Sequence, residues 1–312
     1  MGGVSYMISM LTGQDNAELL EDLSPMKISD DWQKSLSIDV GNDFRRLSKI
    51  EYWMCPKTKF CWYAPQEAAG GEELYKQLQK FDWYYMPDKW EFNMALSLLP
   101  AGCSILEIGV GRGHFLQFAK KRGYFAQGVE LNSLGASQAR SLGFQVHELM
   151  LDDIAQKTST RFDAICSFQV LEHVPDPRKF FDGMLSLLKP GGKLILSVPN
   201  AAVLRKVDPR NLSLLNQPPH HMSHWDEGIF RALEEYFPVK VTSVHHEPLA
   251  THHLAWMVSG YLKNFLSPLG ERITRLIVNR YTILPIQWMT RIGIRRFVPG
   301  HTLLVELEYL NN

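Results

Sequence analysis

The stretch that decides the fold is residues 104–131, SILEIGVGRGHFLQFAKKRGYFAQGVEL. It begins with an apolar run typical of a buried strand, turns at a cluster of glycines, continues with a helical pattern and ends in a second strand pattern. Two strands joined by a helix in this way predict neighbouring parallel strands. Ligands that resemble nucleotides bind at the glycine turn of such units.

The glycine turn limits which ligand can bind. Gly109, Gly111 and Gly113 permit a tight turn and a close approach of the ligand to the backbone. A dinucleotide fingerprint requires its third glycine at position 114, where this chain has His114. The Gly-Lys-Ser/Thr of a phosphate-binding loop does not follow either. Glu107 precedes the turn, and its carboxylate repels a pyrophosphate but suits a ligand that carries an amino group and a sulfonium.

A second carboxylate points to the same ligand. Glu130 closes the second strand, at a distance from Gly109 that lets it accept hydrogen bonds from both hydroxyls of a ribose. We therefore expect S-adenosylmethionine as the cofactor. A glycine turn without any ligand is the alternative interpretation.

From about residue 91 the sequence alternates strand-like and helix-like patterns, which predicts an α/β fold with a mostly parallel sheet. Strands are expected at 104–109, 125–130, 144–148, 162–168, 193–198, 238–244 and 302–309. Helices are expected near 112–122, 133–142, 177–188 and 225–236. We divide the chain into an N-terminal extension with an aromatic-rich cap (1–90), a cofactor-binding domain (91–250), a helical insert (251–299) and a last strand (300–312).

Several motifs follow one another in an order that belongs to a known family. They are ILEIGVGRG, GVEL, FDAICSFQVLEHVPDPRKFFDGMLSLLKPGGKLILSVPN and GHTLLVELE. With these motifs the chain resembles class I S-adenosylmethionine-dependent methyltransferases, and within them the ubiquinone-biosynthesis O-methyltransferases, over about residues 90–250 and the last strand. The resemblance implies a Rossmann-like sheet of seven strands whose last strand is antiparallel.

The resemblance also implies the cofactor contacts. It assigns to S-adenosylmethionine the residues Glu107, Gly109, Gly111, Gly113, Glu130, Leu131, Phe168 and Gln169. Relatives often have an acidic residue after the third strand that binds the adenine amino group, but Met150 stands there in this chain. The backbone of Met150 and Leu151, or the side chain of Asp152, is expected to take over that contact.

Histidines follow two of the expected strands on the side where the acceptor should lie. His173 ends FQVLEH, and His220, His221 and His224 lie in NQPPHHMSHWDEG. In one interpretation, His173 or His221 is the general base that takes a proton from the acceptor. In another, Glu172, His173 and His220 or His221 hold a divalent metal. In the third, the histidines are structural and cap the following helix.

The segments outside the core are less informative. Ser29 is expected to cap a short helix at SDDWQKSL, and Cys55 and Cys61 resemble the remnant of a zinc ribbon that has lost its metal. The aromatic segment from Tyr52 to Trp90 is interpreted as a packed cap or as a lid that contributes Trp83, Tyr84 and Tyr85 to the site.

The insert 251–299 is predicted to form three amphipathic helices that cap the substrate pocket. Its excess of basic residues also fits peripheral contact with an anionic membrane surface.

Composition excludes few functions. The formal net charge is zero, so no nucleic acid partner is expected. We predict a cytoplasmic enzyme that methylates an oxygen of a small-molecule acceptor, such as a sugar, a lipid-linked precursor or a quinone-like metabolite. Two alternatives stay open, an RNA 2′-O-methyltransferase and a catalytically silent scaffold that binds the cofactor.

Overall fold

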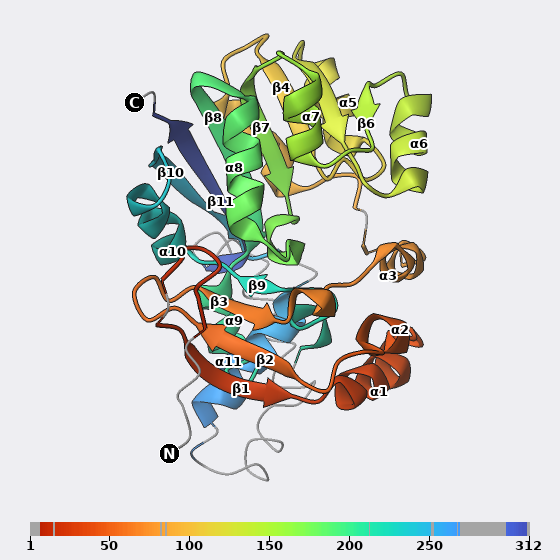
Figure 1. Cartoon of the computed structure of the whole chain (residues 1–312), viewed down its shortest axis with the longest axis vertical. Coiled ribbons are helices and arrows are strands. Elements are labelled where there is room, and N and C mark those ends of the chain that lie inside the picture. The colour runs from red at the N-terminus through yellow and green to blue at the C-terminus, as the bar shows by residue number, and fades with distance from the viewer. Residues whose placement is uncertain are drawn as a thin grey trace.

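A seven-stranded sheet forms the centre of the computed structural model, which describes residues 7–14, 16–81, 83, 84, 86–211, 213–250, 253–266, 268 and 298–310 (Figure 1). The strands, in spatial order, are β10 (Val239–Pro248), β11 (Pro299–Tyr309), β8 (Leu188–Pro199), β7 (Phe162–Phe168), β4 (Ser104–Ile108), β5 (Phe125–Val129) and β6 (Val146–His147). The strands β4 to β8 are parallel, whereas β11 runs antiparallel to both of its neighbours. The expected Rossmann-like sheet with an antiparallel last strand is therefore confirmed.

Helices cover both faces of this sheet. The helices of the cofactor-binding part are α4 (Trp90–Leu98), α5 (His114–Lys121), α6 (Ser133–Ser141), α7 (Leu151–Lys157), α8 (Pro177–Leu187), α9 (Ala201–Val207) and α10 (Glu227–Ala232), with short 3-10 turns η2 (Leu171–His173), η3 (Leu214–Asn216) and η4 (Leu233–Glu235). Alternate residues of β4 face opposite sides: Ile105 packs in the cluster under α4 and α5, and Leu106 in the cluster under α8. A sheet buried on both faces explains why its strands read as continuous apolar runs.

Several elements differ from the sequence expectation, and the helices α7 and α9 were not expected. The helix α4 was not expected, although its Phe92 packs 5.5 Å from Phe115 between ring centres. The edge strand β6 has only two residues, whereas five were expected at 144–148. The strand β8 begins directly after α8 at Leu188, whereas the strand was expected to begin at residue 193.

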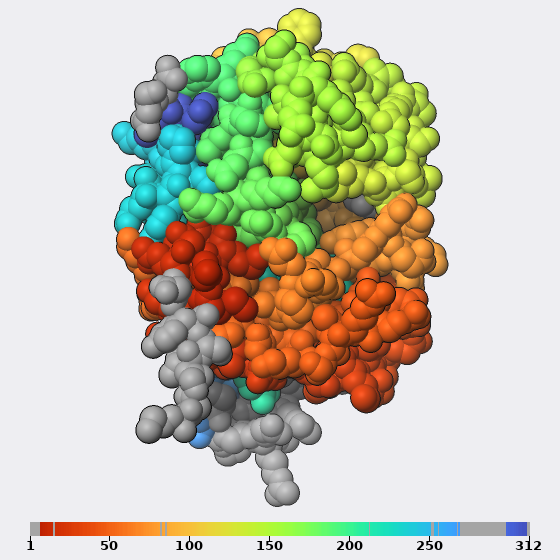
Figure 2. Space-filling view, in the orientation of Figure 1, coloured from red at the N-terminus to blue at the C-terminus, as the bar shows by residue number. Residues whose placement is uncertain are grey.

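The N-terminal part forms a sheet of its own, with strand order β1-β2-β3-β9. It contains β1 (Glu18–Leu23), β2 (Ile50–Met54), β3 (Cys61–Ala64) and β9 (Ser223–His224), and beside it lie α1 (Pro25–Leu36), α2 (Gly41–Phe44), η1 (Gln66–Ala68) and α3 (Glu72–Leu78). The strand β9 comes from the histidine-rich loop of the core, so the two parts share a strand. Figure 2 shows the red and orange N-terminal part packed against the green and cyan core.

The first helix begins earlier than expected. Ser24 is its N-cap, and the Ser24 hydroxyl accepts a hydrogen bond from the backbone N–H of Lys27. Ser29 lies inside the helix, so the prediction that Ser29 caps it is wrong. Ser24 is the better cap because Pro25 follows it, and proline is favoured in the first helical turn.

The helical insert is described only in part. Its first expected helix is α11 (Leu254–Leu266), which packs Leu254 and Met257 into a small cluster with Val203 and Val207 of α9. The other two expected helices, at 271–281 and 286–297, lie outside the described residues. Among the helices that the structure describes, none has the length and apolar character needed to cross a membrane.

One tryptophan joins the two parts of the molecule. Trp225 is 1% exposed and packs against Phe60 of the N-terminal part, Phe181 of α8 and Phe230 of α10. Its indole N–H donates a hydrogen bond to the Ser223 hydroxyl at 2.8 Å. We expect this contact to stabilise both sheets at once.

Replacing this residue tests the connection. Trp225→Ala should lower the free energy of unfolding by about 3–5 kcal/mol, because it leaves a large cavity between the sheets. Denaturant titration followed by circular dichroism measures this change. The control Met26→Ala, at a side chain that is 76% exposed, should change it by less than about 0.5 kcal/mol. Equal effects of both substitutions would contradict the assigned contact.

Candidate active site

The glycine loop between β4 and α5 forms one wall of a cavity of about 880 Å³. Gly109 and Gly111 line this cavity and have φ angles of 81° and 53°, in the left-handed region that favours glycine. A Cβ atom on Gly109 would lie 2.3 Å from Val170 Cγ2. The loop therefore needs glycine at this position, as the sequence predicted. Gly113, in contrast, does not line the cavity, and its backbone packs against Ala139 of α6.

Two carboxyl groups flank the loop, that of Glu107 buried and that of Glu130 partly buried. Glu107 is 3% exposed, and its Oε2 has no hydrogen-bond partner among the described residues. Burial raises the pKa of Glu107 well above its usual value. A ligand with an ammonium group would supply the missing partner of this carboxylate. Glu130 accepts hydrogen bonds from the backbone N–H groups of Gly111 at 2.8 Å and Asn132 at 2.7 Å, so it is held rigidly at the cavity.

The expected adenine contacts lie at one end of the cavity. Leu131, Met150 and Leu151 line it, and the first two are more than half exposed. Asp152 does not line the cavity, and its carboxylate pairs with Lys179 at 3.3 Å. The described residues thus offer mainly apolar side chains and the start of α7 at this end.

Phe168 and Gln169 follow β7 and also line the cavity. Phe168 is buried, with its ring centre 4.7 Å from that of Phe115. Gln169 has a φ angle of 56°, and its amide donates to the Ser197 hydroxyl at 3.4 Å. The backbone therefore turns sharply where β7 ends, and this turn leads directly to His173.

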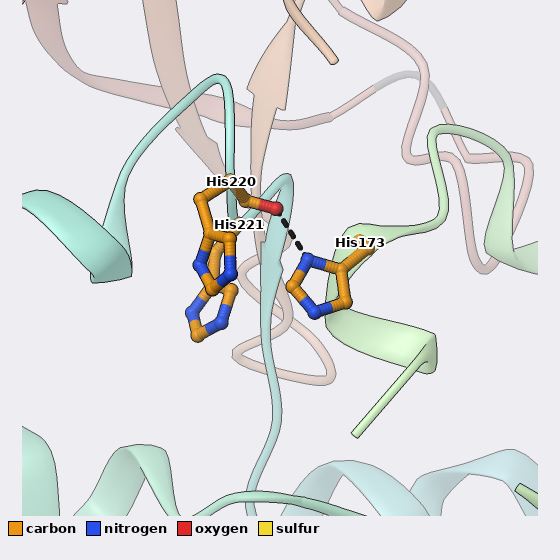
Figure 3. A group of neighbouring side chains, drawn as sticks. All are labelled: His173, His220 and His221. Carbon is orange, nitrogen blue, oxygen red and sulfur yellow. Dashed lines mark hydrogen bonds between the residues drawn. The ribbon is translucent and has the colours of Figure 1, made fainter. Parts of the chain in front are cut away.

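Three histidines meet at the cavity that the glycine loop also lines. His173 comes from η2, and His220 and His221 come from the loop before β9 (Figure 3). Each offers a ring nitrogen within 4.8 Å of those of the other two. Sequence analysis had left open which histidines approach His173, and the structure brings both His220 and His221 to it.

The hydrogen bonds of the cluster fix which nitrogen carries the proton. His173 Nδ1 lies 2.5 Å from the carbonyl oxygen of His220, and His220 Nδ1 lies 2.8 Å from that of Leu215. Carbonyl oxygens only accept hydrogen bonds, so both Nδ1 atoms are protonated. The Nε2 atoms of these rings therefore carry free electron pairs.

His221 has the same tautomer for a less direct reason. Its Nδ1 lies 3.2 Å from Asn216 Oδ1. The Asn216 amide nitrogen donates to Asn211 Oδ1 at 2.7 Å, so Asn216 Oδ1 is an acceptor and His221 Nδ1 is a donor. His224 completes the network, with its two nitrogens 2.6 Å from the Tyr52 hydroxyl and 2.9 Å from the Asn216 carbonyl oxygen.

Glu172 lies between two of these rings. Its Oε1 is 3.9 Å from His173 Nε2 and 4.0 Å from His221 Nε2, and neither of its oxygens has a hydrogen-bond partner among the described residues. The side chain is 2% exposed, and burial raises the pKa of Glu172 to about 8. Burial lowers the pKa of His173 to about 4. Burial and the neighbouring imidazole rings lower the pKa of His221 well below its usual value. At neutral pH the imidazoles are uncharged.

The interpretation of these histidines as helix caps is wrong. The N-cap of α10 is Asp226, whose carboxylate accepts from the backbone N–H of Ile229 at 3.1 Å. His220 and His221 instead line the same cavity as the glycine loop, and their rings lie beside that of His173 (Figure 3). The general-base and the metal interpretations both fit this position.

The cavity is also lined by segments for which the sequence patterns gave little indication of a role in the site. Trp83 and Tyr84 line it, as the lid interpretation predicted, and Tyr85 lies outside the described residues. Trp256 of α11 and His301 of β11 also line it, although no sequence pattern singled them out. Near Cys55 and Cys61, the described residues provide no further ligands that would complete a metal site.

Comparison with known proteins identifies the family. A family profile described as "Methyltransferase domain" matches residues 76–237, just over half of the chain. The chain belongs to this methyltransferase family. The enzyme class and the S-adenosylmethionine cofactor expected from the sequence are thus confirmed.

Individual relatives are distant. A ubiquinone biosynthesis O-methyltransferase from Xanthomonas axonopodis pv. citri is 36% identical over 109 residues, which cover 33% of this chain and 46% of that protein. One from Coxiella burnetii is 27% identical over 171 residues, 47% of this chain and 69% of that protein. The chain thus spans about half the length of the first relative. A solved S-adenosylmethionine-dependent methyltransferase from Mesorhizobium loti is 16% identical, with a TM-score of 0.47, and covers 70% of this chain and 97% of that one.

The buried His224 predicts a dependence of stability on pH. Burial lowers the pKa of His224 to about 4, below the value near 6.5 of an unfolded histidine. The unfolded chain therefore binds more protons between these values, so the contribution of His224 is present above pH 6.5 and is lost as the pH falls toward 4. His224→Gln should flatten the slope of unfolding free energy between pH 6.5 and 4. An unchanged slope in denaturant titrations would show that His224 does not titrate as described.

Proposed function

We propose that this methyltransferase transfers the methyl group of S-adenosylmethionine to an oxygen of a small-molecule acceptor. One observation carries the proposal: the glycine loop and the cluster of His173, His220 and His221 face a single cavity. A cofactor on the loop and an acceptor at the histidines would therefore meet within it. The names of the relatives, which are O-methyltransferases of ubiquinone biosynthesis, agree with an oxygen acceptor.

The cofactor supplies a methyl group that is already activated on a sulfonium, so the chain mainly has to bind and align. We assign Glu107 to the amino group, because its buried Oε2 lacks a partner. Glu130 is assigned to the ribose, and the backbones of Gly109 and Gly111 to the methionine part. Leu131, Met150 and Leu151 form an apolar seat for the adenine. Phe168 and Gln169 close the methionine side.

The acceptor side is formed by aromatic side chains and by the histidines. Tyr75 packs edge-on against His173 with ring centres 5.8 Å apart, and Trp83, Tyr84 and Trp256 line the same cavity. Such a wall suits an acceptor with a flat or apolar body and excludes water from the sulfonium. Since α11 contributes Trp256, we assign acceptor selectivity to the segment 251–299.

His173 and His221 are the residues that we assign to the acceptor oxygen. Their Nε2 atoms carry free electron pairs, and both rings are uncharged at neutral pH. A hydroxyl group that binds there donates its hydrogen toward these nitrogens, which orients its oxygen for in-line attack on the methyl carbon.

An RNA substrate fits less well. The described side chains at the cavity include seven acidic residues but only two lysine or arginine residues, Lys89 and Arg112. Binding of phosphate groups needs an excess of cationic over acidic side chains.

A silent scaffold would bind the cofactor without turnover. Incubation with methyl-labelled S-adenosylmethionine and separate pools of phenols, sugars, lipids and RNA separates the three functions. Label in RNA, or in no pool despite cofactor binding, would contradict the proposal.

Glu130 allows a direct test of the cofactor contacts. Glu130→Ala should weaken S-adenosylmethionine binding by about 1–3 kcal/mol, because charge-assisted hydrogen bonds are lost. Gly111→Val should abolish binding, because a branched side chain blocks the approach to the loop. Calorimetric titration measures both. The control Glu21→Ala, on the exposed strand β1, should keep the affinity of the natural chain; normal affinity in all three variants would contradict the assignment.

A further inference from the structure

The histidine cluster has the features of a cation site. Three imidazole rings offer nitrogens within 4.8 Å of one another, and in each ring the Nδ1 atom is already engaged by an oxygen. The Nε2 atoms are thus the ones left to bind a ligand. The Tyr84 hydroxyl reaches His220 Nε2 at 3.3 Å, which is long for an O–H···N hydrogen bond.

A carboxylate completes the group. Glu172 is buried, both of its oxygens lack a hydrogen-bond partner among the described residues, and Oε1 lies about equally far from His173 Nε2 and His221 Nε2. A buried carboxyl group without a partner is costly, and it indicates a ligand that is missing. A cation placed between these three side chains would satisfy all of them.

Hydrogen bonds from the second ring nitrogen hold the three histidine rings in the way that metal-binding histidines are usually held. Metal-binding histidines usually donate their second ring N–H to a carbonyl or amide oxygen, which fixes the tautomer. His173 and His220 donate to backbone carbonyls, and His221 donates to Asn216. Asn216 is itself held by Asn211 and, through its carbonyl, by His224 of the N-terminal sheet. The ligand set is therefore ordered before any ion binds.

The charge at the cavity favours a cation as well. Besides Glu172, the described cavity walls carry Glu72, Asp88, Glu91, Glu107, Glu130 and Glu247. Neutral imidazoles are poor bases at neutral pH but are the form that binds metal ions. The acidic side chains around the cluster therefore attract cations to the cavity.

We propose that Glu172, His173, His220 and His221 bind a divalent transition-metal ion at the acceptor side of the cavity. Imidazole nitrogens favour zinc, iron, cobalt or nickel over magnesium, which prefers oxygen ligands. Binding of the ion depends only on these side chains. Its role in catalysis rests on the proposed function.

An ion at this site would make the acceptor oxygen a better nucleophile. A hydroxyl group in contact with the ion would have a lowered pKa and would give up its proton to solvent before methyl transfer. The oxygen then forms the new bond to the methyl carbon while the carbon–sulfur bond breaks, and the electron pair of that bond remains on sulfur. With the ion bound, the Nε2 atoms of His173 and His221 would be its ligands, and the acceptor oxygen would contact the ion in place of the direct hydrogen bonds to these rings.

Cobalt titration tests the site without any methyl transfer. The whole protein, freed of metal by a chelator and then of the chelator, is titrated with Co²⁺, whose visible absorption reports nitrogen ligands. We expect Co²⁺ binding to saturate at one ion per chain. Zn²⁺ should displace the bound Co²⁺, whereas Mg²⁺ at the same concentration should not. His221→Ala and the isosteric Glu172→Gln should each weaken Co²⁺ binding at least about tenfold, as should Asn216→Leu, which removes an outer partner.

Controls separate this site from surface binding and from the proposed function. His245→Gln, in β10 and remote from the cluster, should bind Co²⁺ like the natural chain. Thermal unfolding and S-adenosylmethionine affinity should stay normal in Glu172→Gln, which checks its fold. Absence of Co²⁺ binding, or equal binding by the natural chain and Glu172→Gln, would overturn the site. Co²⁺ binding at the cluster without methylation of any acceptor would instead count against the proposed function and leave the site intact.

Discussion

The backbone of one residue, Met222, links the two sheets at the site through hydrogen bonds. The N–H of Met222 donates to the Glu172 carbonyl at 2.7 Å, and its own carbonyl accepts from the N–H of Tyr63 at 2.8 Å. Tyr63 belongs to the N-terminal sheet, and Glu172 follows β7 of the large sheet. Because buried backbone groups must be paired, this arrangement fixes the distance between the sheets and thereby the positions of His220 and His221.

This connection explains why the N-terminal part is more than a cover. Its strand β3 pairs with β9 of the histidine loop, and Tyr52 of β2 contacts His224. His224 in turn holds Asn216, which sets the tautomer of His221. The chemistry on the acceptor side thus depends on hydrogen bonds that begin about 170 residues earlier in the chain.

Local patterns predicted the cofactor half of the molecule well. Glu107, the glycine loop and Glu130 lie within one strand–turn–helix–strand unit, so their geometry follows from local structure. Sequence could not show that Gly113 serves helix packing or that Asp152 pairs with Lys179, because both depend on contacts with other helices. The strand β1 was missed because its residues are mostly exposed and half of them are acidic. The orphaned carboxyl group of Glu172 was visible only after three distant segments had been brought together.

The claim on which the rest of the account depends is that the cavity binds S-adenosylmethionine. Calorimetric titration of the intact protein with S-adenosylmethionine, S-adenosylhomocysteine, NADH and ATP tests it most directly. The account predicts tight, one-to-one binding of the first two ligands and no measurable binding of NADH or ATP, because Glu107 repels phosphate groups. Binding of NADH or ATP without S-adenosylmethionine would contradict it.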